Sequence, residues 1–94
     1  MQIIPLRPEP SQNLSIVLNG QNCDISVYTL STGLYFDLAS NGVQICSTRL
    51  CVNAVDIIRN KSTGFIGDFA FIDMVGIDNP NYTELGTRYL LVYQ

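Results

Sequence analysis

The sequence contains no histidine, and this absence removes several kinds of chemistry at once. Histidine is the commonest general base, the usual partner of a catalytic serine or cysteine, and the commonest metal ligand. No phosphate-binding P-loop and no GxGxxG segment follows any expected strand. Carboxylates are the remaining catalytic groups, and no acid–base partner for a nucleophile is visible. The sequence therefore predicts a protein that is not an enzyme and carries no cofactor.

Charged residues are scarce as well. They make up 14% of the chain, whereas hydrophobic residues make up 47%, and soluble domains usually carry about a quarter charged residues. This balance excludes a disordered chain, and it fits either a plain apolar core or an apolar surface meant for protein partners. The net charge is −3. The basic residues are too scattered to track phosphates, so we expect no nucleic-acid partner; they are Arg7, Arg49, Arg59, Lys61 and Arg88.

Membrane and export signals are missing from the sequence. No stretch approaches the roughly 18 apolar residues of a transmembrane helix, and residues 1–10 lack the pattern of a signal peptide. We therefore expect a soluble protein made in the cytoplasm, with no membrane partner. The odd number of cysteines and the absence of a CxxC pair favour small buried core residues over a disulfide or metal site; they are Cys23, Cys46 and Cys51.

The first half of the chain predicts two β-hairpins. Apolar and polar residues alternate along 14–18 and 23–28, on either side of Asn19-Gly20, and the pattern recurs around Asn41-Gly42. An Asn-Gly pair between two alternating runs is the strongest short-range hairpin signal, because both residues of the turn must take a positive φ.

The second half is less regular. It predicts strands at Val55–Arg59, Phe65–Met74 and Thr87–Tyr93, with a turn at Asn60–Gly64 and a loop at Gly76–Gly86. Gly67 is a candidate bulge within its strand. Helical periodicity is nearly absent. The fold class is therefore all-β, a small single domain over residues 1–94, built as a sandwich or barrel of about six to eight short strands from hairpins.

The N-terminal ten residues form a proline-rich segment. Three prolines within six positions keep the backbone extended and remove ladder donors, which is typical of an edge strand or an arm. Its apolar residues Ile3, Ile4 and Leu6 need cover, worth about 1.5–3 kcal/mol each when fully buried. We expect the arm to pack partly against an adjacent chain, so that deleting it leaves a folded monomer. The alternative is an edge strand folded back on its own domain.

Two other groups of residues are candidates for function. The stretch from Asp73 to Asn81 is rich in oxygen donors but lacks the order of a calcium loop, so we expect a turn rather than a metal site. Asp68 and Asp73 are five apart on one expected strand, point to opposite faces and cannot act as a close pair. Tyr28 and Tyr35 fall on the less apolar faces of their strands, where tyrosine suits a protein interface. Inward-facing positions in a two-sheet fold are the alternative.

Four stretches, taken together and in order, carry a resemblance to a known family. They are Ile4-Pro5-Leu6 leading into 18–23, then Gly33–Leu38, Leu50–Asn53 before Ile57–Arg59, and Gly64–Asp73 continuing to Arg88-Tyr89. They resemble the baseplate plug family of contractile-tailed bacteriophages, from about Ile3 to Tyr93. The resemblance implies a structural virion protein at the centre of the tail baseplate, in contact with the hub and the lower end of the tail tube. It supplies no catalytic residues.

Assembly around a tail axis imposes cyclic symmetry, and a threefold hub predicts three or six copies in each virion, assembled in the host cytoplasm. The alternative function is a soluble ligand-binding β-sandwich, such as a carbohydrate-binding or calcium-dependent module.

Overall fold

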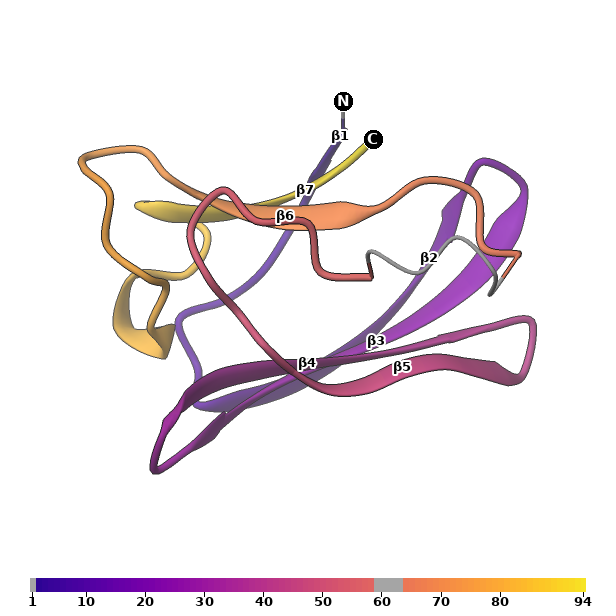
Figure 1. The fold of residues 1–94 in the computed structure, drawn as a ribbon, viewed down its shortest axis with the longest axis horizontal. Helices are drawn as coiled ribbons and strands as arrows, with labels where there is room; N and C mark the ends of the chain where they lie inside the picture. The colour runs from indigo at the N-terminus through magenta and orange to yellow at the C-terminus, as the bar shows by residue number, and fades with distance from the viewer. Residues whose placement is uncertain (1, 59–63) are drawn as a thin grey trace.

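The computed structural model describes residues 2–58 and 64–94, which form two antiparallel sheets in two layers (Figure 1). The larger sheet is a meander of β2 (Ser11–Leu18), β3 (Gln21–Leu30), β4 (Gly33–Ser40) and β5 (Val43–Leu50). The smaller sheet has the order β1-β7-β6, with β1 at Gln2–Ile4, β6 at Phe69–Asp73 and β7 at Tyr89–Tyr93. The sheets do not close on one another. The all-β prediction is therefore confirmed, in the form of an open sandwich.

Helix is almost absent from the described ranges. The helical element there is the 3-10 turn η2 at Tyr82–Glu84. No helix among the described residues has the length and apolar character needed to cross a membrane.

Both predicted hairpins are present, and their turns have the expected geometry. Asn19 and Gly20 take φ angles of 52° and 76°, and Asn41 and Gly42 take 52° and 81°. Two consecutive positive φ angles give the turn a twist that matches the right-handed twist of the flanking strands. The strands pair directly up to each turn, Leu18 with Gln21 and Ser40 with Val43. Local turn chemistry therefore sets the register of β2 with β3. In the β4–β5 pair it sets the register only beside the turn, because the register shifts between Phe36 and Ala39.

The core lies between the two sheets. Phe36 of β4 and Phe69 of β6 are fully buried, and their ring centroids lie 5.3 Å apart. Tyr93 of β7 packs on Phe69 at the same centroid distance. Gln21 joins the layers through polar contacts as well. Its side chain donates to the Ile66 carbonyl at 3.1 Å and accepts from the Ile66 amide at 3.0 Å.

Several strand boundaries predicted for the second half of the chain are wrong. Residues 55–58 form no strand, and Arg59 lies outside the described residues. Ala54 takes a φ of 59°, which interrupts an extended chain. The segment instead follows the outer edge of β6, where the Ala54 amide donates to Phe71 and the Ile57 amide donates to Phe69, each at 2.8 Å.

The other two strands are shorter than predicted. β6 begins at Phe69 rather than Phe65, and Gly67 lies in the preceding loop with a φ of 94° instead of forming a bulge within the strand. β7 begins at Tyr89 rather than Thr87. The predicted turn at 60–64 lies outside the described residues except for Gly64. The predicted loop at 76–86 is present and contains η2.

The N-terminal segment folds back on its own chain. β1 pairs with β7, and Ile3 lies opposite Val92. Ile4 and Leu6 are buried in the core between the sheets, whereas Ile3 is 57% exposed. This is the alternative given above, an edge strand folded back on its own domain, and in this arrangement deletion of residues 1–10 would remove two core side chains and an edge strand. A contact of Ile4 or Leu6 with an adjacent chain would require β1 to detach.

Candidate functional site

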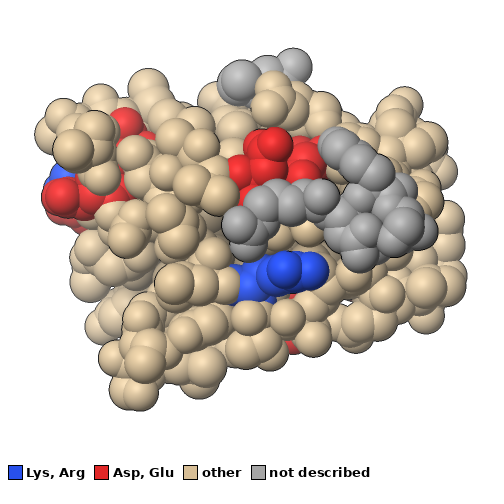
Figure 2. Space-filling view, in the orientation of Figure 1, with Lys and Arg blue, Asp and Glu red and all other residues tan. Residues whose placement is uncertain are grey.

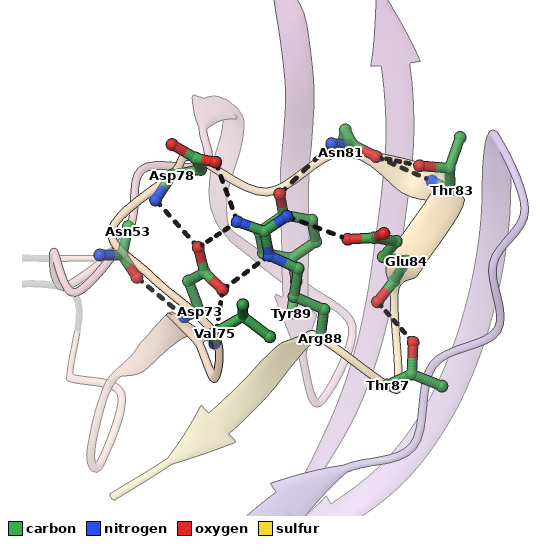
Figure 3. A network of polar contacts seen from close by, with 10 residues as sticks. All are labelled: Asn53, Asp73, Val75, Asp78, Asn81, Thr83, Glu84, Thr87, Arg88 and Tyr89. Atoms are coloured by element: carbon green, nitrogen blue, oxygen red, sulfur yellow. Dashed lines mark hydrogen bonds and ion pairs between the residues drawn. The ribbon is translucent and has the colours of Figure 1, made fainter.

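The most connected polar group in the described residues lies where β6 ends and β7 begins (Figure 3). Asp73 is the last residue of β6, and Arg88 directly precedes β7. Because the two strands are antiparallel neighbours, Asp73 lies opposite Tyr89 in the register. The Arg88 guanidinium donates through Nε to Oδ1 of Asp73 at 2.8 Å and through Nη2 to Oδ2 at 2.9 Å. This two-pronged geometry is the strongest that an arginine and a carboxylate can form.

Both oxygens of Asp73 also accept backbone hydrogen bonds. The amide of Val75 donates to Oδ1 and the amide of Asp78 donates to Oδ2, each at 2.9 Å. The Asp73 side chain has no exposed surface. The hydrogen bonds from Arg88 and from the backbone amides hold the pKa of Asp73 well below its ordinary value, although burial opposes them. Asp73 is therefore ionised at neutral pH and fully hydrogen-bonded.

Further acidic and aromatic groups surround Arg88. Its Nη2 contacts the Asp78 carboxylate at 2.8 Å, and its Nη1 contacts the Glu84 carboxylate at 3.3 Å. The guanidinium carbon lies 5.0 Å from the centroid of the Tyr89 ring, within the range of a cation–π contact. One guanidinium therefore contacts three carboxylates and an aromatic ring. These four charged groups, Asp73, Asp78, Glu84 and Arg88, are called the Arg88 cluster below.

The Arg88 cluster and its neighbours fix the loop that leaves β6. Besides the two bonds to Asp73, the Met74 amide donates to the Arg88 carbonyl at 2.8 Å. The Asn79 side chain accepts from the Asn53 amide at 3.1 Å, and the Asn53 side chain accepts from the Asp73 amide at 2.9 Å. Hydrogen bonds thus fix the loop at both ends and in its middle.

The side chains carried by this loop point into solvent. Met74, Val75 and Ile77 are 61%, 77% and 87% exposed. Residues 74–77 are called the apolar loop below. Sequence reasoning weighed the oxygen donors here as turn or metal ligands and missed the arginine, because Arg88 joins them only through the pairing of two strands. The available signal was an acidic residue next to the end of one predicted strand, Phe65–Met74, and an arginine next to the start of the following one, Thr87–Tyr93.

The cation held by these oxygen donors is the guanidinium of the chain itself. Asp73, Asp78 and Glu84 all contact Arg88. Among the described residues, no group of three or more acidic or cysteine side chains is arranged to hold a metal ion. Asp68 stands apart from this cluster: its carboxylate accepts from the amides of Ile58 and Phe69 at 2.8 and 2.7 Å. Asp68 and Asp73 therefore have separate roles, and each carboxylate accepts hydrogen bonds from backbone amides.

Tyr28 and Tyr35 lie directly opposite each other on β3 and β4. Their neighbours Val27 and Phe36 are buried, so the two tyrosines occupy the other face of the larger sheet, where they are half-buried. The rings stack with centroids 6.1 Å apart. The Tyr28 hydroxyl donates to Asp37 at 2.8 Å, so its polar end is already satisfied within the sheet. The pair presents two stacked, half-buried aromatic rings on the outer side of the sandwich.

The three cysteines are free thiols in buried positions. Burial raises the pKa of Cys51 to about 12, and it also raises the pKa of Cys23 and Cys46. Such thiols are protonated and unreactive at neutral pH. Their described surroundings are those of small core residues.

The comparison with known families gives the context for these features. The whole chain, residues 1–94, matches the family described as "Cyanophage baseplate Pam3 plug gp18". No curated protein matches the chain. The open β-sandwich is therefore a structural component of a bacteriophage tail, of the class that builds the baseplate. Within that class, the chain belongs to the cyanophage baseplate plug family.

Proposed function

We propose that the chain is the plug at the centre of the baseplate, where it contacts the hub and the lower end of the tail tube. The observation that carries the proposal is the family match over the full length of the chain. The action is geometric. The subunit docks on its neighbours, holds the hub together and blocks the tube until the tail contracts, without catalysing a reaction.

The surface of the domain supports assembly through apolar and aromatic contacts. Figure 2 shows one face on which most exposed atoms belong to uncharged residues. Charged groups are depleted and aromatic groups enriched at the centres of protein interfaces. Ile3, Tyr28 and Tyr35 are the sequence-predicted interface residues with surface left for a partner, and they lie on different sheets. More than one neighbour can therefore be engaged at once.

The symmetry of the tail sets the expected stoichiometry. Components around a threefold hub occur in multiples of three, so we propose three or six copies in each particle, assembled in the host cytoplasm. Quantitative mass spectrometry of purified particles tests this number against a tail protein of known copy number. A chain that is absent from washed particles would contradict the structural role.

Native mass spectrometry with purified hub protein tests the proposed neighbour directly. We expect a complex of defined stoichiometry, and its stability should decrease when Tyr28 and Tyr35 are both replaced by serine. Exchange of Thr29 and Thr32 for serine is the matched control, because both residues are exposed near the hairpin turn that joins the same two strands. Failure to form any complex with the hub would count against a central position.

A further inference from the structure

The apolar loop is exposed in a way that folding does not explain. Single apolar residues are common on protein surfaces, but here three large apolar side chains occupy four consecutive positions. Each of them is more than half exposed, so none contributes much to the core of its own domain. Contiguous exposed apolar groups with a polar border are typical of protein interaction sites.

Hydrogen bonds hold the same loop more firmly than a surface loop without a binding role requires. The Val75 amide within the loop and the Asp78 amide directly after it both donate to a carboxylate without exposed surface, that of Asp73, which is itself fixed by Arg88. Such ordering lowers the conformational entropy that binding would otherwise cost. Figure 3 shows the Asp73 carboxylate between the loop that carries Val75 and Asp78 and the guanidinium of Arg88. The geometry is that of a preorganised docking element.

We propose that the apolar loop inserts into an apolar pocket on a different protein of the baseplate, and that lysine or arginine side chains border this pocket. The inference rests on the proposed function and names the element and the chemistry of one contact within it. Charge supports the choice of partner. The three carboxylates of the Arg88 cluster exceed its one guanidinium by two negative charges, and Asp78 and Glu84 are 70% and 47% exposed. A basic border would complement them.

A second copy of this chain carries a net charge of −3, so it complements the carboxylates beside the loop less well than a basic partner does. Within residues 2–58 and 64–94, Arg7 already pairs with Glu9, and Arg88 is committed to its own cluster. Only Arg49 is then left as a basic side chain outside an ion pair in that part of the chain. An anionic membrane is disfavoured too, because the exposed carboxylates beside the loop would be repelled by the lipid headgroups.

Site-specific photo-crosslinking in complete particles tests the occupant. A benzophenone amino acid replaces Ile77, and the control replaces Val43, which is 62% exposed at a hairpin of the other sheet. After irradiation of purified particles, we expect position 77 to form an adduct with a different baseplate protein, at a peptide that borders lysine or arginine. An adduct with a second copy of this chain, an adduct with lipid, or no adduct in particles that contain the chain overturns the inference.

A pair of double variants tests whether the loop contributes affinity. Val75→Thr with Ile77→Thr removes apolar surface from the loop, and Val17→Thr with Val43→Thr removes similar exposed surface elsewhere, since Val17 is 63% exposed. We expect the loop variant to be incorporated into particles at least about tenfold less well than the wild type, and the control variant to remain within about twofold. Thermal unfolding of both purified variants checks that their folds are equally intact.

Incorporation into particles separates failure of the proposed function from failure of the docking inference. If the chain is absent from particles, the proposed function is contradicted and the docking inference falls with it. If the chain is present in the expected number but the loop variant is incorporated like the wild type, only the docking inference is contradicted.

Discussion

Asp73 and Arg88 are 15 positions apart in the sequence, yet their side chains meet in a two-pronged ion pair at the end of the smaller sheet. The pair depends on tertiary structure, because only the antiparallel register of β6 and β7 brings the two residues together. Removal of one member of a buried pair leaves the other charge without compensation. Asp73 also binds two loop amides, so its replacement disturbs charge and backbone together.

Asp73→Asn should therefore destabilise the fold much more than Asp78→Asn. The substitution at position 73 would place an amide donor against the Arg88 guanidinium, whereas Asp78 is 70% exposed and makes one surface ion pair, worth at most about 1 kcal/mol. Urea unfolding of the two variants and the wild type measures the difference. Equal unfolding free energies for the two variants would contradict the importance of the ion pair between Asp73 and Arg88 for the stability of the fold.

The Asp73→Asn variant also tests how the stability of the fold depends on pH. The folded-state pKa of Asp73 is lowered, so the stabilisation is fully present above the unfolded value of about 3.9 and is lost as pH falls through the lower folded value. We expect the gap in unfolding free energy between wild type and Asp73→Asn to be constant from pH 7 to pH 5 and to narrow below about pH 4. A gap that stays unchanged down to pH 2 would contradict the lowered pKa.

Gly86→Ala should be more damaging than Gly20→Ala. Both glycines have positive φ angles, 84° and 76°, so each alanine incurs a backbone strain of about 1–2 kcal/mol. A Cβ at residue 86 would also clash with the carbonyl oxygen of Leu6, whereas a Cβ at residue 20 meets no atom within 4 Å. The segment after β1 would have to move. Comparable unfolding midpoints in urea for the two variants would contradict this close approach.

Ile4→Ala should destabilise the domain by about 2–5 kcal/mol, as expected for a buried isoleucine. Ile3→Ala, on the same short strand, should cost less than about 1 kcal/mol, because Ile3 is more than half exposed. Chemical denaturation separates the two values. If the Ile4 variant is as stable as the Ile3 variant, then β1 does not pack on the domain in solution, and the arm is available to a neighbouring chain.

The thiols should be nearly inert in the native protein. With a folded-state pKa of about 12 for Cys51, almost no thiolate is present at pH 8, so reaction with a disulfide reagent should require unfolding. In guanidinium chloride all three cysteines should react within minutes. Because the thiol pKa is raised on folding, stability should also fall as pH rises from about 9 toward 12. Rapid labelling of the native protein at pH 8 would contradict the burial of these groups.

The sequence was informative where structure depends on neighbours along the chain. The two Asn-Gly turns specify their hairpins locally, and the alternation along β2, β3 and β4 specifies which residues face inward. The alternation was wrong on β5, where the register with β4 shifts, so that Val43 is exposed and Cys46 is buried. The sequence was misleading at Val55–Arg59, where β-branched residues suggested a strand but the positive φ of Ala54 leaves residues 55–58 as irregular backbone against β6. Ile4 and Leu6 are buried within the chain itself. Their burial depends on the pairing of β1 with the distant strand β7, which local sequence patterns do not reveal. The Arg88 cluster was missed for the same reason.

The pairing of β1 with β7 has a consequence for the order in which the domain folds. Gln2 lies opposite Tyr93, so this contact closes a loop of almost the entire chain, whereas β2 to β5 pair through short turns. Local pairings form faster than distant ones, because less chain entropy is lost before a contact is made. We expect the meander to form early and the smaller sheet to close last. In pulse-labelled hydrogen exchange, amides of β3 and β4 should gain protection before those of β7.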